Sequence, residues 1–125
     1  MNILLGNTDA HIKNWSLIYH DKMNPILSPA YDIVSSLTYI SDRNNALNLG
    51  GIKYFYDLNQ DAVDTFIRHT LLPADIVNNA ITTTIESAQA TWPLLIKELP
   101  IETKVRNTLN HHFTQLQHPF KINPF

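Results

Sequence analysis

A change of pattern near residue 59 limits the folds open to this sequence more than any other feature. Beyond it, apolar side chains recur at intervals of four, four, three and four residues, at Val77, Ile81, Ile85, Ala88 and Trp92. Such spacing places all five on one face of a helix, and that face needs an apolar partner to cover it. The second half of the chain, 59–117, therefore predicts three packed helices, expected at about 60–72, 73–93 and 100–116.

The first half of the chain predicts short elements joined by turns. Ile3, Leu4 and Leu5 end at Gly6, which is typical of the last turn of a helix and its C-terminal glycine. Alternating apolar and polar residues, a turn segment and a proline-flanked return predict a β-hairpin over 15–29. We expect a polar loop over 41–46. The fold class is therefore mainly α with a small β-hairpin.

The domain limits follow from length and from the ends of the predicted elements. The 125 residues, 44% of them hydrophobic, suffice for one domain with a real core. We expect this domain to cover 1–118, followed by an extended or frayed tail over 119–125. Asn59 is the expected N-cap of the first long helix, and Pro73 suits the first turn of the second.

Composition excludes several classes of protein. A net charge of −2 argues against direct binding of nucleic acid, and the absence of cysteine excludes disulfides, thiol catalysis and Cys-ligated zinc. No apolar run approaches the roughly 18 residues of a membrane span, so we expect a cytoplasmic protein without a membrane partner. Charged residues make up only 16% of the chain, against roughly 25% in typical domains. We expect part of the surface to be covered.

Polar residues concentrate in segment 6–16, where Asn14 follows Asp9 by five residues. This spacing, on a loop that enters a strand, matches the catalytic loop of protein kinases, where the Asp orients the attacking hydroxyl and the Asn binds Mg²⁺. Asp32 follows the predicted hairpin, within segment 29–36. Because a hairpin brings its ends together, we expect Asn14 and Asp32 to reach one magnesium ion through oxygen ligands. Asn7 is expected to cap or brace the loop.

Three blocks of the sequence resemble the C-terminal half of HipA-type toxin kinases. Segment 6–16, Gly-Asn-Thr-Asp-Ala-His-Ile-Lys-Asn-Trp-Ser, is similar to the family's GNTDxHxKN-[FW]-S loop. Segment 27–35, Leu-Ser-Pro-Ala-Tyr-Asp-Ile-Val-Ser, resembles its L-x-P-x-YD-[IV]-x-S segment. Residues 47–51 and 55–58 resemble its LALxIGG segment and the stretch before the next helix. The D-x-H-x-x-N core alone is shared with phosphatidylinositol kinases, but the three blocks together are much more specific.

The resemblance implies the C-terminal, helical lobe of a protein-kinase-like fold. It also implies phosphorylation of a protein Ser or Thr with ATP and Mg²⁺ as cofactors. In that family the targets are aminoacyl-tRNA synthetases, such as glutamyl-tRNA synthetase. The family's partner is a HipB-like helix-turn-helix antitoxin, so any association with DNA would be indirect.

The resemblance also implies roles for five residues. Asp9 corresponds to the catalytic Asp, and Asn14 and Asp32 to the pair that binds the metal and, through it, the nucleotide. Lys13 lies in the same loop, where it either neutralises developing phosphate charge or is a solvated loop lysine. His11 either assists proton transfer or is a structural histidine that orients Asp9.

The match departs from a complete kinase in one respect. A Gly-rich phosphate loop and a strand lysine hold the nucleotide in kinases. In this family such elements precede the catalytic loop, and Gly50-Gly51 cannot replace them. Three interpretations stay open: part of an active kinase, one subunit of a split kinase, or an inert module that binds antitoxin or substrate.

Three histidines near the C-terminus offer a possible metal site of a different kind. His111 and His112 are adjacent, and His118 follows them. Adjacent residues on a helix point about 100° apart and do not form an i, i+4 pair. We therefore expect solvated histidines on a helix surface.

Overall fold

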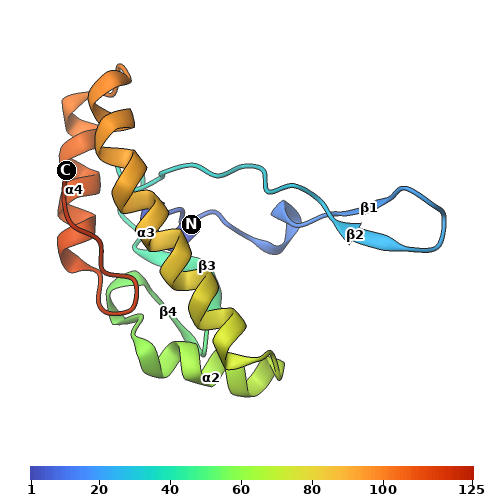
Figure 1. The fold of residues 1–125 in the computed structure, drawn as a ribbon. Helices are drawn as coiled ribbons and strands as arrows, with labels where there is room; N and C mark the ends of the chain where they lie inside the picture. The colour runs from blue at the N-terminus through green and yellow to red at the C-terminus, as the bar shows by residue number, and fades with distance from the viewer.

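A computed structural model describes residues 1–125. It contains four α-helices, two 3₁₀ turns and two separate antiparallel hairpins, and no mixed or larger sheet (Figure 1). In chain order the elements are α1 (Asn2–Leu5), η1 (Ile12–Asn14), β1 (Leu17–Tyr19), β2 (Pro25–Leu27), β3 (Asn44–Leu49), β4 (Ile52–Tyr54), η2 (Phe55–Asp57), α2 (Gln60–Thr70), α3 (Ala74–Glu98) and α4 (Thr103–Gln115). The predicted class, mainly α with a small hairpin, agrees with this arrangement.

Local chemistry sets both ends of α2. The Asn59 side chain accepts a hydrogen bond from the Ala62 N–H at 3.1 Å, which confirms the predicted N-cap. At the other end Leu71 adopts a left-handed backbone, with φ 57°, and its N–H bonds to the Ile67 carbonyl. The helix therefore ends at Thr70, two residues before the predicted limit.

Helix α3 is longer than the sequence predicted. It continues past Pro93 to Glu98, so the expected end near Pro93 is wrong. Proline removes one backbone donor, but contacts on both sides of it maintain the helix. Trp92 lies 6.1 Å from Phe113 between ring centroids, and the Arg106 guanidinium donates to the Ile96 carbonyl at 3.1 Å.

The predicted start of the last helix was also wrong. Helix α4 begins at Thr103, whereas the proline at 100 suggested a start there. Leu99 has an extended backbone and Glu102, with φ −55° and ψ 139°, is not helical, so the chain makes a short linker between α3 and α4.

Two apolar clusters form the core of the helical body. One joins α1, α3, α4 and the C-terminal segment; its buried members are Leu4, Ala88, Leu109, Phe113, Leu116 and Ile122. The other joins η2, α2 and the loop after β2; its buried members are Leu37, Phe55, Leu58, Ala62, Val63 and Phe120. Ile3 and Tyr56 pack against both clusters, so α1 lies where the two meet.

The C-terminal segment 119–125 contains no helix or strand, but it is not frayed. Phe120 and Ile122 are buried, and the Phe125 ring contacts Trp92 and Phe113. Asn110 and Phe125 exchange two hydrogen bonds, at 2.7 and 2.8 Å. Of the two expectations, an extended or a frayed tail, the frayed one is wrong because these apolar side chains complete both clusters.

Residues of the candidate site lie just before and just after the first hairpin. Strands β1 and β2 pair antiparallel, with Ile18 opposite Ile26, and the hairpin projects away from the helices (Figure 1). None of its strand residues is buried. The hairpin expected over 15–29 is therefore present, with strands of only three residues each.

The second hairpin was not predicted. Strand β3 occupies Asn44–Leu49, so the expected polar loop over 41–46 is wrong in its second half. Strand β4 pairs with it, and Gly50 and Gly51 make the turn with positive φ angles of 58° and 89°. A Cβ on Gly50 would collide with the Ala62 backbone, so the turn lies directly against α2.

No helix of the chain combines the length and the apolarity needed to cross a lipid bilayer.

Candidate active site

The end of α1 sets the direction of the polar loop. Gly6 has φ 62°, and its N–H bonds to the Ile3 carbonyl at 3.2 Å, which closes the helix. A Cβ at this position would collide with the buried Leu37 side chain. Only glycine fits both the backbone angle and the space, so the loop leaves α1 in one fixed direction.

Asn7 joins the two ends of the site. Its side chain is 1% exposed, and Nδ2 donates to Asn2 Oδ1 at 3.2 Å and to the Asp32 carbonyl at 3.1 Å. Its Oδ1 accepts from the Asp9 N–H at 3.0 Å. One buried amide therefore positions the backbone of both acidic residues, as the expected bracing role requires.

The hairpin brings Asn14 and Asp32 together. Asn14 Nδ2 donates to Asp32 Oδ2 at 2.8 Å and to the Asp9 carbonyl at 3.3 Å. Asp32 itself has a left-handed backbone, with φ 56°, which Asp tolerates better than most residues. The expected juxtaposition of these two side chains is thus present in the structure.

Asp9 and His11 are neighbours without a hydrogen bond. His11 Nε2 lies 3.8 Å from Asp9 Oδ1, beyond hydrogen-bond distance. The Asp9 side chain is 67% exposed, and the His11 Nδ1 atom is buried without a partner. Solvent therefore has access to the carboxylate, with an imidazole beside it.

Lys13 contributes its backbone rather than its side chain to the loop. Its carbonyl accepts a hydrogen bond from the Tyr31 hydroxyl at 2.9 Å, while its side chain is exposed. The same hydroxyl lies 2.6 Å from Ser16 Oγ. Tyr31 therefore connects the loop before β1 to the segment after β2.

Ser36 is a second buried link, and sequence reasoning missed it. Its Oγ accepts from the Thr8 N–H at 2.9 Å and donates to the Gly6 carbonyl at 3.1 Å. Thr8 Oγ1 lies 2.8 Å away. Ser36 directly follows segment 27–35, and no periodicity distinguishes it from neighbouring serine and threonine residues.

The side-chain oxygens of Asn14 and Asp32 are suitable ligands for a hard divalent cation. Both hydrogen bonds of the Asn14 amide use Nδ2, which leaves its Oδ1 free beside the exposed carboxylate of Asp32. Magnesium accepts such oxygens and keeps several waters, so two protein ligands are enough. No group of three His, Cys, Asp or Glu side chains gathers anywhere in the chain.

His112 is buried, which corrects the expectation of a solvated histidine; its neighbour His111 is exposed as expected. His112 Nε2 lies 2.8 Å from the Ile3 carbonyl and Nδ1 lies 3.3 Å from the Tyr56 hydroxyl. Burial lowers the pKa of His112 to about 4. The neutral ring therefore donates from Nε2 to α1, the helix that leads into the loop.

The family comparison covers most of the chain. The model of the HipA-like C-terminal domain matches residues 1–92. That stretch contains α1, the polar loop, both hairpins, α2 and most of α3.

Two curated relatives and one solved structure resemble the chain. "Putative kinase Y4dM" of Sinorhizobium fredii is 38% identical over 87% of this chain and 27% of its own length. "Putative kinase Y4mE" of the same organism is 30% identical over 69% of this chain and 20% of its own length. A chain of the Shewanella oneidensis complex of HipA, HipB and operator DNA matches 91% of this chain and 27% of its own length, at 23% identity and a TM-score of 0.71.

This chain spans about a quarter of the length of those proteins. The family model nevertheless covers well over half of it. The chain belongs to the family of HipA-like C-terminal domains.

Proposed function

We propose that this chain is the catalytic-loop and metal-binding part of a HipA-type kinase that phosphorylates a protein Ser or Thr. The observation that carries the proposal is the 2.8 Å contact between Asn14 and Asp32, with the Asp9 backbone held on the same loop. These are the base and the oxygen ligands that phosphoryl transfer needs. The relatives named putative kinases, and the fold shared with a chain of the solved HipA complex, support it.

Each residue then has a defined task. Asp9 accepts the proton of the attacking hydroxyl, and its exposed carboxylate is accessible to a protein substrate. Asn14 Oδ1 and Asp32 would hold Mg²⁺, which when bound neutralises phosphate charge and orients ATP. His11 orients Asp9 or assists the proton transfer, and the exposed Lys13 side chain would neutralise developing phosphate charge.

The proposed partners follow from the family. The solved complex contains HipA, HipB and operator DNA, which supports a HipB-like antitoxin as a partner here. The net charge of −2 favours indirect rather than direct contact with DNA. The proposed substrate is an aminoacyl-tRNA synthetase such as glutamyl-tRNA synthetase, in the cytoplasm.

A second candidate rests on length. The chain covers 27% of the length of the 38% identical curated relative. In the resembled family the elements that hold the nucleotide precede the catalytic loop, and the second proposal is one subunit of a split kinase or an inert module that binds antitoxin or substrate.

Incubation of the chain with γ-labelled ATP, Mg²⁺ and glutamyl-tRNA synthetase tests the proposal. Labelled synthetase with the wild type, none with Asp9→Asn, and unchanged labelling with the matched exposed control Asp57→Asn would support the proposal. Labelling that survives Asp9→Asn contradicts the assigned role. No labelling together with no ATP binding at millimolar concentration supports the inert module, and transfer to phosphoinositide instead supports a lipid kinase.

A further inference from the structure

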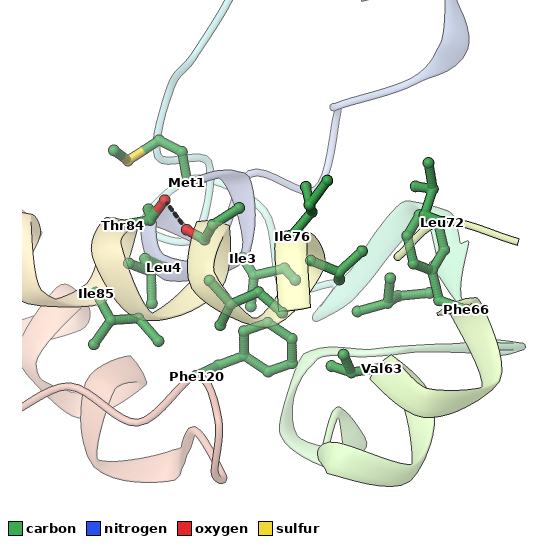
Figure 2. A pocket seen from close by; sticks show the side chains of 14 residues that line it. Met1, Ile3, Leu4, Val63, Phe66, Leu72, Ile76, Thr84, Ile85 and Phe120 are labelled. Atoms are coloured by element: carbon green, nitrogen blue, oxygen red, sulfur yellow. Dashed lines mark hydrogen bonds between the residues drawn. The ribbon is translucent and has the colours of Figure 1, made fainter. Parts of the chain in front are cut away.

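Two hollows in the surface differ in their chemistry. The larger, of about 440 Å³, lies between α1, α2 and α3, and 13 of its 14 lining residues are hydrophobic (Figure 2). Its remaining side chain, Thr84, donates its hydroxyl to the Ala80 carbonyl at 2.7 Å. The smaller, of about 120 Å³, lies at the base of the first hairpin, where Asn14, Tyr31 and Asp32 all line it. Tyr31 therefore shares a hollow with the two candidate metal ligands.

The Tyr31 hydroxyl makes two hydrogen bonds whose directions are fixed. It lies 2.9 Å from the Lys13 carbonyl and 2.6 Å from Ser16 Oγ. A carbonyl oxygen only accepts, and a tyrosine hydroxyl has one proton, so Tyr31 donates to Lys13. Ser16 must then donate its own proton to the Tyr31 oxygen. The three groups form one chain of hydrogen bonds, in which each bond strengthens the next.

This chain of hydrogen bonds joins the residues that directly precede the two candidate ligands. Lys13 precedes Asn14, and Tyr31 precedes Asp32. The bond between the hydroxyl and the carbonyl therefore limits how far the backbone at Asn14 lies from the backbone at Asp32. At this separation Asn14 Nδ2 reaches Asp32 Oδ2 at 2.8 Å.

The other restraints on the two ligands cannot replace this bond. Asn7 donates to the Asp32 carbonyl and accepts from the Asp9 N–H, so it fixes Asp32 relative to Asp9 rather than to Asn14. The direct contact of Asn14 uses an Asp32 oxygen that a metal ion would also bind. The bonds of the Tyr31 hydroxyl involve no ligand atom, so they persist when a cation is bound.

Asp32 also needs a restraint on its N-terminal side. Its backbone is left-handed, with φ 56°, a conformation that a residue other than glycine keeps only when its surroundings hold it. Asn7 holds the Asp32 carbonyl, and the Tyr31 hydroxyl holds the residue before Asp32. The strained residue is therefore fixed from both sides.

We propose that Tyr31 is a positioning residue, whose hydroxyl holds Asn14 and Asp32 at the separation at which both can ligate one divalent cation. It acts through the Lys13 carbonyl rather than by contact with the ion, and Ser16 orients the hydroxyl. The inference rests on the proposed function for the presence of the cation. The hydrogen-bonded geometry itself does not depend on that function.

Removal of this one hydroxyl tests the proposal. Tyr31→Phe keeps the ring and the wall of the hollow but loses both hydrogen bonds. Tyr54→Phe is the matched control, because Tyr54 is 41% exposed against 43% for Tyr31 and lies outside the hollow. The probe is Mn²⁺, which takes the same oxygen ligands as Mg²⁺. Electron paramagnetic resonance follows free Mn²⁺ during a titration of each protein and gives its affinity.

We expect the wild type and Tyr54→Phe to bind Mn²⁺ equally, and Tyr31→Phe to bind it at least about fivefold more weakly, as for the loss of one typical hydrogen bond. Ser16→Ala should give a smaller loss, and no further loss in combination with Tyr31→Phe, because Ser16 acts through the hydroxyl. The unfolding midpoint should stay the same in Tyr31→Phe, since Tyr31 belongs to neither apolar cluster. Equal affinity of Tyr31→Phe and wild type, or equal weakening in Tyr54→Phe, overturns the proposal.

NMR without metal separates this inference from the proposed function. Tyr31→Phe should shift the Asn14 side-chain amide signals and speed their exchange with water, whereas Tyr54→Phe should leave them unchanged. If the wild type binds no Mn²⁺, the metal-binding part of the proposed function fails, and shifted Asn14 signals still support the positioning role. Unshifted Asn14 signals in Tyr31→Phe overturn that role whether or not Mn²⁺ binds.

Discussion

The helical body and the site-bearing hairpin are stabilised by different interactions. In the body, two apolar clusters bury side chains such as Phe113 and Phe55 completely. In the first hairpin no strand residue is buried, and the register depends on three residue pairs. The base of the hairpin is held instead by polar links, through Asn7, Ser36 and Tyr31.

This difference teaches that folding and site assembly are separable here. Apolar packing determines whether the helical body folds, and its energy depends little on the orientation of the contacting groups. Hydrogen bonds have angular requirements, so the buried amide of Asn7 can place Asp9 and Asp32 accurately at small energetic gain. We expect substitutions in the helical body to change the free energy of unfolding. Substitutions at the base of the first hairpin should instead change the geometry of the candidate site.

Truncation of the core gives the largest expected effect. Phe113→Ala removes a fully buried ring and should lower the free energy of unfolding by about 3–5 kcal/mol. Met23→Ala, at an 82% exposed position of the hairpin turn, should change it by less than about 0.5 kcal/mol. Urea denaturation followed by circular dichroism measures both. Equal losses for the two variants would remove the distinction between body and hairpin.

The second-largest expected effect is a loss of stability when His112 is protonated. The pKa of this buried ring is about 4 when folded against 6.5 for an unburied histidine, so the unfolded chain binds more protons between those values. Stability should therefore fall as the pH drops from 6.5 to 4, by an amount on the order of 3 kcal/mol, and stay level with respect to His112 above 6.5.

Denaturation at a series of pH values checks this expectation. His112→Gln should flatten the curve between pH 4 and 6.5, whereas His111→Gln, at the exposed neighbouring position, should leave it steep. A curve that keeps its slope in His112→Gln would show that other groups cause the pH dependence.

Loss of the Asn7 side chain gives a smaller energetic effect but a larger local one. Asn7→Ala removes three hydrogen bonds and should cost about 1–3 kcal/mol. The amide NMR signals of Asp9 and Asp32 should shift while those of α4 stay in place. Asn24→Ala, which alters only contacts to Asp21 in the hairpin turn, should leave these signals unchanged. Unshifted Asp9 and Asp32 signals in Asn7→Ala would refute the bracing role.

Features of the fold with local causes were predictable from sequence. Asn59 caps α2 through a neighbouring N–H, and Gly6 ends α1 through its own backbone angle. Features with distant causes were not. Helix α3 passes Pro93 because Arg106 and Phe113 of α4 contact it, and His112 is buried because the Ile3 carbonyl accepts a hydrogen bond from its ring.

The same distinction holds for the site. Asn14 and Asp32 could be paired because they lie at the two ends of one hairpin, which is a topological argument. Ser36 could not be found, because its partners Gly6 and Thr8 lie about thirty residues away and meet it only when the loop closes. Strand β3 was missed because pairing with β4, rather than the composition of its Asn-rich sequence, makes it a strand.

Paramagnetic NMR with Mn²⁺, which substitutes for Mg²⁺, tests most directly whether Asn14 and Asp32 bind a divalent metal. Low concentrations of Mn²⁺ should broaden the amide signals of Asp9, Asn14 and Asp32 before those of the exposed carboxylates Asp57 and Asp61. Excess Mg²⁺ should reverse the broadening, and Asp32→Asn should abolish it without loss of the helical circular dichroism signal. Equal broadening at Asp57 and Asp61, or broadening that persists in Asp32→Asn, would contradict the assignment of this loop as the metal-binding part of the site.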